Sequence, residues 1–379
     1  MKKTLYLSIL AATLMGGQVF AAEVIPTKLD GATDTGANSY SGQKVTGTGE
    51  EAKETNVTIY ADNAGNDCAS ITVYGGWSTK GAANNNTVTM TGGLVKSVYG
   101  GKAQNDATGN TVTISNGQVK YTVYGGSGGT DISKNSLIMT GGTVQNSVYG
   151  GHSTETGAVV KENTVIVAGN SELSSNLYCG YSSHGDAKDN KVYLVGKGAT
   201  ATIADAKGIT STYTGGNIKL KTVYAGYGDG TLDNNSIDIY GTGITASGYV
   251  AKMQILNFHI SQNQIGGEYA NASMLTLTTY GMDLTNVTIG IQDVDVQAWT
   301  PGTMVTLVQL EQDKRTITGI ESGKEVDIMR GNQVVAKGQL VLSNDDKTLS
   351  LSIPGSVPEP TTGTLGLLAL AGLCIRRRK

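Results

Sequence analysis

The stretch Thr91-Gly92-Gly93-Leu94-Val95-Lys96-Ser97-Val98-Tyr99-Gly100-Gly101 contains a pattern that recurs along the chain. Its Tyr-Gly-Gly ending occurs four times at intervals of 25 residues, and altered copies follow. A fixed period of this size, made of short β-type runs and glycine turns, is typical of a solenoid. We expect each coil to contribute one tyrosine to a structural ladder: Tyr74, Tyr99, Tyr124, Tyr149, Tyr178, Tyr224 and Tyr249.

A second pattern, Asn-x-aliphatic-x-aliphatic, precedes most of these copies. Residues 87–90 alternate between polar and apolar, which favours a strand, and the Gly92-Gly93 pair then predicts a turn. The sequence therefore predicts an all-β fold: a parallel β-helix of about 25 residues per coil, right-handed because connected parallel strands nearly always are. In such a stack the asparagine amides can donate to and accept from one another: Asn86, Asn110, Asn135, Asn163, Asn190 and Asn235.

The glycine corner tolerates substitution at one of its two positions. Cys179, Ala225 and Val250 replace the first glycine, so we expect an ordinary negative φ there. The second glycine persists until Ala251, which predicts either left-handed backbone or a close approach between coils. Cys179 is then an apolar substitute in a corner rather than a nucleophile.

One repeat carries an insertion. The interval between Tyr178 and Tyr224 is 46 residues, and residues 196–213 account for the excess. Insertions in solenoids collect on one face, which is often the face that binds a partner. We expect this segment and the variable loops to carry any binding function.

Composition limits the classes of function. The chain has 53 Gly and 2 Phe among 379 residues, which suits thin coils better than a wide globular core. Its formal net charge of −3 becomes −8 once two N-terminal lysines and a basic tail are removed. That sign argues against nucleic acid as a partner. Cys68 and Cys179 lie more than four repeats apart, too far for a disulfide.

The two ends of the chain resemble targeting segments. Residues 1–21 have the charged and apolar regions of a signal peptide. Cleavage is predicted after Ala21, with Ala22 as the neighbouring alternative, and the secretion translocon is a predicted partner.

The body between the two ends divides into three parts. We interpret residues 22–55 as a leader and cap, and residues 56–262 as the solenoid. Residues 263–353 predict a C-terminal β domain that caps it, or equally several wider, irregular coils.

Residues 354–379 join a Pro-Glu-Pro motif, an apolar run and a basic end. This order resembles the PEP-CTERM sorting signal of exosortase substrates. The resemblance implies a short C-terminal apolar helix that anchors the chain transiently in the inner membrane. It also implies a membrane-embedded, exosortase-like sorting protease that delivers the body to the cell surface; a plain C-terminal anchor is the alternative. The residues of the signal are Pro358, Glu359, Pro360, Arg376, Arg377 and Arg378.

The repeats themselves resemble the passengers of autotransporter-type adhesins, through Asn-Thr-Val-Thr, Gly-Gly-x-Val and Val-Tyr-Gly-Gly. Three functions follow as hypotheses: an adhesin for a surface glycan or protein, a structural component of the envelope or extracellular matrix, and, as the alternative, a carbohydrate-active lyase or hydrolase. The tyrosine ladder is either purely structural or a strip on which sugars stack.

Enzyme chemistry has weak candidates. Asp186 with Asp189, and Asp229 with Asp233, are spaced like turn residues rather than like catalytic or Ca²⁺-binding pairs. His152, His184 and His259 are scattered along the chain and do not make a zinc site. We therefore expect no enzyme activity, no cofactor and no metal.

Overall fold

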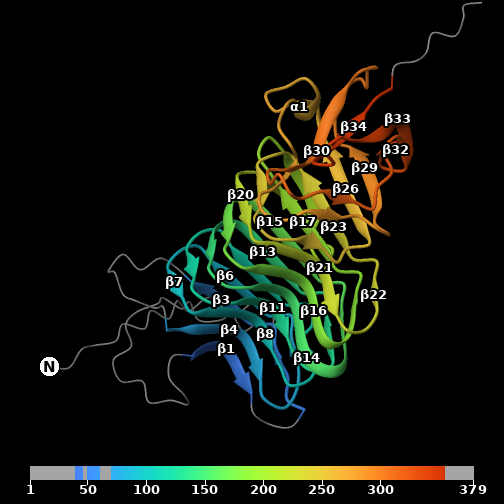
Figure 1. The fold of residues 1–379 in the computed structure, drawn as a ribbon. Coiled ribbons are helices and arrows are strands. Elements are labelled where there is room, and N and C mark those ends of the chain that lie inside the picture. Colours follow the sequence, from blue (N-terminus) through green and yellow to red (C-terminus); the bar gives the residue numbers. More distant parts are fainter. Residues whose placement is uncertain (1–38, 46–48, 60–69, 355–379) are drawn as a thin grey trace, which may run out of the picture.

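The computed structural model describes residues 39–45, 49–59 and 70–354, with the side chains described from residue 49 onward. Strands dominate this part of the chain, and they stack as coils along one long axis (Figure 1). The only helix among the described residues is α1 (Gln262–Ile265). The prediction of an all-β chain with parallel pairing is confirmed.

The first ladder of parallel strands carries the Asn-x-aliphatic runs. Its members pair in register from coil to coil, in the order β3 (Asn56–Ile59), β6 (Thr87–Met90), β9 (Thr111–Ile114), the first half of β13 (Ser136–Val144), the first half of β15 (Thr164–Leu173), β17 (Lys191–Val195), β23 (Ser236–Tyr240) and β26 (Ile255–Ile260).

Two further ladders complete each coil. The second follows the Gly-Gly turn: β7 (Leu94–Val95), β10 (Gln118–Val119), the second halves of β13 and β15, β20 (Ile218–Leu220) and β24 (Ile244–Ala246). The third carries the Tyr-Gly-Gly runs: β1 (Ser39–Val45), β4 (Thr72–Ser78), β8 (Ser97–Lys102), β11 (Val123–Ser127), β14 (Val148–Lys161), β16 (Asn176–Lys188), β21 (Thr222–Gly228) and β25 (Val250–Ala251). Short strands in the loops also pair. β2 (Ala52–Lys53) pairs with β5 (Ala83–Asn84), β12 (Asp131–Ser133) pairs with β14, and β22 (Leu232–Asp233) pairs with β16.

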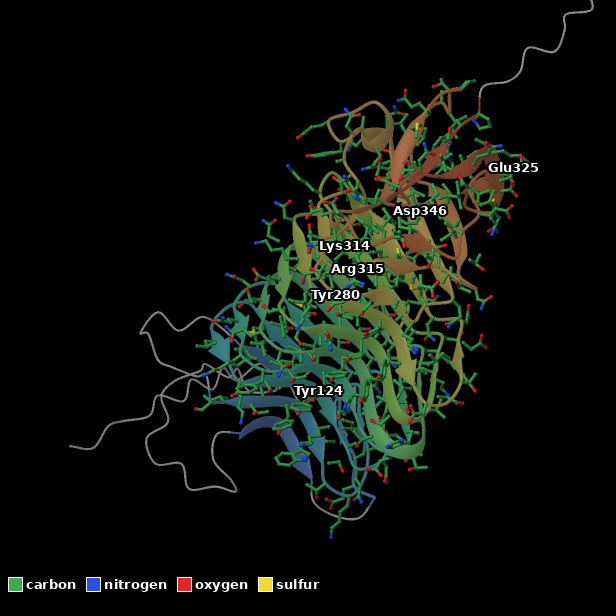
Figure 2. All side chains as sticks on the ribbon, in the orientation of Figure 1. Tyr124, Tyr280, Lys314, Arg315, Glu325 and Asp346 are labelled. Carbon is green, nitrogen blue, oxygen red and sulfur yellow. The ribbon has the colours of Figure 1, made fainter. Side chains whose placement is uncertain are left out.

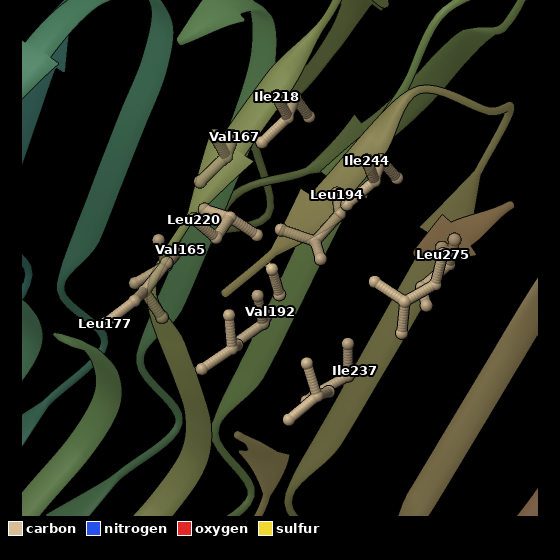
Figure 3. Packing of buried hydrophobic residues seen from close by; sticks show 14 of the residues in the cluster. Val165, Val167, Leu177, Val192, Leu194, Ile218, Leu220, Ile237, Ile244 and Leu275 are labelled. Atoms are coloured by element: carbon tan, nitrogen blue, oxygen red, sulfur yellow. The ribbon is translucent and has the colours of Figure 1, made fainter. Parts of the chain in front are cut away.

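The core is a narrow column of aliphatic side chains between the three ladders. Alternation along each strand turns every second residue inward, so Val165, Leu194 and Ile237 are completely buried (Figure 3). Burying a Val, Leu or Ile side chain contributes about 1.5–3 kcal/mol relative to leaving it exposed. A coil with few large residues can therefore be stable when it lies between two others.

Parallel pairing continues beyond residue 262. The first ladder extends through β29 (Thr288–Asp293) to β32 (Lys324–Arg330), and the second through β27 (Leu275–Leu277) to β30 (Met304–Leu310). In the line of the third ladder, β28 (Met282–Asp283) pairs with β31 (Ile317–Thr318). These parallel pairs continue the stack in coils wider than those of residues 56–262. Antiparallel β33 (Gln333–Leu342) and β34 (Thr348–Ser352) then join β32 and β30.

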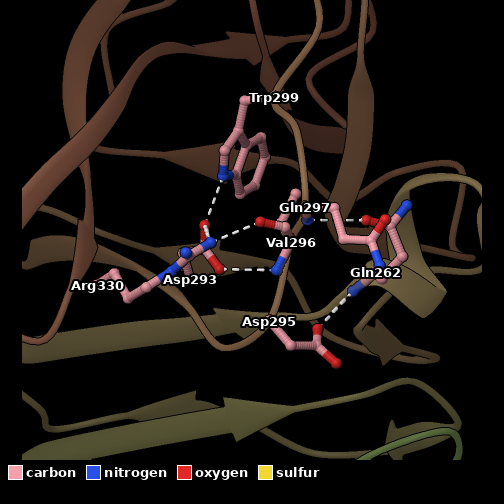
Figure 4. Close-up of polar contacts among 7 residues, drawn as sticks. All are labelled: Gln262, Asp293, Asp295, Val296, Gln297, Trp299 and Arg330. Atoms are coloured by element: carbon pink, nitrogen blue, oxygen red, sulfur yellow. Dashed lines mark hydrogen bonds and ion pairs between the residues drawn. The ribbon is translucent and has the colours of Figure 1, made fainter.

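A buried carboxylate fixes the last wide coils to one another. Asp293 Oδ1 accepts from the backbone N–H of Val296 at 2.9 Å, and Oδ2 accepts from Trp299 Nε1 at 2.7 Å and Arg330 at 2.8 Å (Figure 4). A buried charge is tolerated when donors and a counter-charge satisfy it, as here. The network ties the end of β29 to the end of β32.

The insertion folds as an antiparallel hairpin, β18 (Thr200–Ala204) and β19 (Thr210–Thr214). Ala201, Ile203 and Tyr213 of this hairpin form a separate apolar cluster with Ile166 and Val195, which lie on the outer side of the first ladder. The predicted extent of the insertion agrees with the hairpin. Its apolar face covers the solenoid, so this face does not present a free binding surface.

The second corner glycine is explained by a contact rather than by its backbone angle. A Cβ at Gly101 or Gly126 would lie 2.5–2.6 Å from the side chain of Asn110 or Asn135, and neither glycine has a positive φ. The prediction of left-handed backbone at this position is wrong. The close contact is with the asparagine side chain that follows nine residues later, not with the backbone of a neighbouring coil. Left-handed backbone instead recurs at the residue before each of the six ladder asparagines: Asn85, Gly109, Lys134, Glu162, Asp189 and Asn234.

Candidate functional site

The residues predicted to direct sorting and processing lie outside the described part of the chain. These are the signal-peptide residues Ala21 and Ala22, the predicted apolar helix, and Pro358, Glu359, Pro360, Arg376, Arg377 and Arg378. Cys68 lies outside it as well. Within residues 39–45, 49–59 and 70–354, no helix is both long enough and apolar enough to cross a bilayer.

The asparagine column is a continuous chain of side-chain hydrogen bonds. Asn110 Nδ2 donates to Asn135 Oδ1 at 2.9 Å, and the same oxygen accepts from the backbone N–H of Asn110 at 3.0 Å. The second amide hydrogen of Asn110 goes to the carbonyl of Ala83 at 2.9 Å. The pattern repeats down to Asn235, and all six asparagines are fully buried. Each buried amide is thereby satisfied, as burial requires.

Different residues close the two ends of this column. Thr55 Oγ1 donates to Asn86 Oδ1 at 2.9 Å, and Asn235 donates from its backbone and its side chain to Gln254 Oε1 at 2.9 and 3.2 Å. The sequence patterns did not identify Thr55 or Gln254. Both stand where the next asparagine would be expected, so alignment of the coils is the signal that could have found them.

The tyrosine column is present from Tyr74 to Tyr224. Successive rings lie 4.4–5.2 Å apart between centroids, with interplanar angles of 7–24°. Tyr249 does not belong to it, because Val223 pairs with Val250 and Tyr224 therefore with Ala251. The expectation for Tyr249 is wrong because valine, not tyrosine, sets the strand register at this coil. For the same reason Val250 is not a substitute for the first corner glycine.

A second column runs beside the first, three residues further along each strand. Strand pairing aligns its members in the order Trp77, Lys102, Ser127, His152, Tyr181 and Tyr227. His152 stacks on Tyr181 at 5.2 Å, and Tyr181 on Tyr227 at 5.3 Å. These rings meet the tyrosine column edge-on, as Tyr149 and His152 do at 73°. The residue type varies from coil to coil, so only the fixed offset from each tyrosine could have shown this column.

Burial governs the electrostatics of both columns. It raises the pKa of Tyr149 to about 12, with a further contribution from neighbouring tyrosines, and raises the pKa of Tyr99 further. It also lowers the pKa of His152 to about 4. Lys102 Nζ lies 5.3–5.6 Å from the ring centroids of Tyr74, Trp77 and Tyr99, in cation–π contact, and burial lowers its pKa.

This geometry favours a structural role for the tyrosine column. Neighbouring rings cover one another's faces along the column, so the faces inside it are already occupied. A sugar stacks on a ring face rather than on a ring edge. Stacking of a ligand is therefore feasible only where a column ends or steps sideways.

The remaining candidate side chains are held in separate local contacts. Asp186 accepts from Lys188 at 2.7 Å and from the backbone N–H of Thr231 at 2.8 Å, while Asp229 lies 3.3 Å from His184. The part of the chain that the structure describes contains no group of three or more His, Cys, Asp or Glu suited to a metal ion.

His259 has a partner that the sequence patterns did not reveal. Its Nε2 lies 2.8 Å from Asp238 Oδ1, and its ring stacks on Tyr240 at 3.8 Å. Asp238 also accepts from Asn257 at 2.9 Å. Asp238 and Tyr240 lie on β23, and Asn257 and His259 lie beside them on β26. The Asp238–His259 pair therefore belongs to the outward-facing side of the first ladder.

Cys179 is completely buried, with its thiol 3.1 Å from the carbonyl oxygen of Asn163 and 3.2 Å from that of Lys191. Burial raises the pKa of this thiol, which keeps it protonated. A nucleophilic cysteine needs the opposite environment, with a depressed pKa and access to solvent.

Residues 356–379 match the family model described as the PEP-CTERM protein-sorting motif. Comparison of the chain with curated proteins and with solved structures gave no significant match. The chain therefore carries a C-terminal PEP-CTERM motif, which implies export, recognition by an exosortase-type processing system and sorting to the cell surface.

Proposed function

We propose that this exported, surface-sorted solenoid is a structural component of the cell envelope or extracellular matrix. The observation that carries the proposal is the pair of unbroken side-chain columns, in which Asn and Tyr residues are aligned from coil to coil. Each column binds a coil to its neighbours on both sides. Such an arrangement suits an elongated body that must keep its shape outside the cell.

The proposal includes the absence of catalytic activity. Glycoside hydrolysis uses two carboxyl groups that face one bond across a defined gap. Asp186 is engaged by Lys188 and Thr231, and Asp229 is exposed beside His184. These contacts support turn-stabilising roles. Release of new reducing ends from a polysaccharide, abolished by Asp186→Asn or Asp229→Asn, would instead support the alternative of a carbohydrate-active enzyme.

Adhesion, as in the autotransporter-type passengers that the repeats resemble, is the second candidate. One observation favours it: the aromatic column steps sideways at Tyr249, where a partly exposed ring lies beside Tyr280 and Arg315.

The structural role is testable with the full chain in its host. The double change Pro358→Ala and Pro360→Ala should prevent processing, and the chain should accumulate in the membrane fraction instead of at the surface. Pro301→Ala, a change of the same kind at an exposed turn, is the control and should leave delivery unchanged. Cells that fail to deliver the chain should show weaker cohesion of the envelope or matrix under shear. Unchanged cohesion would contradict the proposal.

A further inference from the structure

The third ladder changes its surface composition at the coil of β25. Val223 pairs with Val250, so Tyr249 lies next to Thr222 of the preceding coil and not next to Tyr224. On the next two coils Met282 pairs with Ile317, which places Tyr280 and Arg315 at equivalent positions, two residues before each strand. A new column of Tyr249, Tyr280 and Arg315 thus begins where the tyrosine column ends.

The first ring of this new column, Tyr249, is more exposed than the rings of the tyrosine column. The Tyr249 and Tyr280 rings lie 4.2 Å apart but are tilted by 36°, and the Arg315 guanidinium lies 5.6 Å from the Tyr280 centroid. Tyr249 is 46% exposed, whereas Tyr178 in the tyrosine column is 9% exposed. Much of the Tyr249 surface is therefore available to a ligand.

A hollow of about 320 Å³ lies against these side chains, and Asp283, Lys314 and Thr318 also line it. Figure 2 shows Tyr280, Lys314 and Arg315 close together, with Tyr124 further along the solenoid. Hydrogen bonds from Thr285 hold the pKa of Asp283 below its usual range, so this carboxylate is ionised at neutral pH. It accepts from the Thr285 N–H at 2.9 Å and lies 3.4 Å from Thr318 Oγ1.

The hollow is locally positive on an acidic protein. Among the described residues, neither Lys314 nor Arg315 has a carboxylate within ion-pair distance, in contrast to the nearby Lys347, which pairs with Asp313 at 2.8 Å. Two cations and one carboxylate therefore face the hollow. The charge complementarity favours a ligand with an anionic group beside hydroxyl groups.

We propose that this hollow, which we call the Tyr249 site, binds a polysaccharide whose sugar units carry carboxylates. The apolar face of a pyranose packs against the exposed Tyr249 ring. Arg315 and Lys314 bind the sugar carboxylate, for which the planar guanidinium is well suited. Asp283 accepts from a sugar hydroxyl. The volume lies at the lower end of the range for small-molecule sites, which suits one sugar unit of a longer chain.

The test uses the purified full-length chain with an oligogalacturonate and with the methyl ester of the same oligosaccharide, which removes the charge and keeps the ring. Binding of the acid should be tighter than that of the ester and should weaken as the salt concentration rises. Arg315→Ala should weaken binding of the acid by about tenfold and have little effect on the ester. Tyr249→Ala should weaken both.

Tyr121→Ala is the matched control. Tyr121 is 45% exposed and has Lys96 Nζ 5.7 Å from its ring centroid, yet it does not line this hollow. Its change should leave both affinities unaltered. Absence of binding to either oligosaccharide, equal affinity for both, or the same loss from Tyr121→Ala as from Tyr249→Ala would overturn the proposal. Each of these outcomes leaves the structural role open to its own test.

Discussion

Asn135 is the position at which the asparagine column can be tested most directly. Asn135 Oδ1 accepts from the backbone and side chain of Asn110, and its Nδ2 donates to the carbonyl of Ala107 at 2.8 Å and to Asn163 Oδ1 at 2.9 Å. Asn135→Ala removes all four hydrogen bonds. The site is fully buried, so the change affects the interior of the column and not its ends.

The expected loss of stability follows from the groups left behind. The Asn110 backbone N–H, one Asn110 amide hydrogen and the Ala107 carbonyl each lose their partner in the interior. A buried polar group without a partner costs about 1–3 kcal/mol, so three together cost roughly 3–9 kcal/mol. We expect about 4 kcal/mol, toward the lower end, because neighbouring groups relax. That is a large share of the roughly 5–15 kcal/mol by which domains are stable.

Urea unfolding followed by circular dichroism measures this loss, with the free energy taken from linear extrapolation. Asn116→Ala is the matched control: the same chemical change at an exposed turn, where Asn116 Oδ1 accepts only from the N–H of Gly117 at 2.8 Å. It should alter the free energy of unfolding by less than about 0.5 kcal/mol. If Asn135→Ala costs no more than Asn116→Ala, the hydrogen bonds of the column do not stabilise the fold.

Three further predictions concern stability. Gly126→Ala should destabilise the chain by about 1–3 kcal/mol in the same urea assay, because its Cβ would lie 2.6 Å from the Asn135 side chain; a neutral result would contradict that contact. Lys134→Gly should raise the free energy of unfolding by about 0.5–1 kcal/mol, since Lys134 has a φ of 54°, and Lys134→Ala should bring no such gain. Burial lowers the pKa of His152 from 6.5 to about 4, so the unfolded chain binds the extra proton between these values and stability falls as the pH drops through this window. His152→Phe should reduce that fall in a pH series of unfolding curves, and an unchanged fall would contradict the buried, neutral imidazole.

The repeat sequence predicted the parallel coils, the asparagine column and most of the tyrosine column. These features depend on residue types that recur at the same place in every coil, which is the information that one sequence contains. Register at an altered coil is different, because it depends on which side chain the interior accepts. At residues 249–251 the buried Val250 sets the strand register, and Tyr249 therefore lies at a surface position outside the tyrosine column.

The candidate site was less accessible to sequence reasoning. Tyr249, Tyr280 and Arg315 come from three coils with different spacing and share no motif, so only the strand pairing brings them together. The second aromatic column was missed for a related reason, since Lys102, His152 and Tyr181 differ in type at one structural position.

The asparagine column also bears on how such a chain can change its length. Every internal asparagine has the same partners, although the intervals between them range from 24 to 45 residues. A duplicated or deleted coil would therefore meet the same hydrogen-bonding surface above and below, and only the ends at Thr55 and Gln254 are unique. Each asparagine donates to the next one along the chain. Coils could therefore exchange places in the stack, but none could be turned upside down without reversing its donor and acceptor. The protein is thus built to grow or shrink by whole coils through tandem duplication or loss.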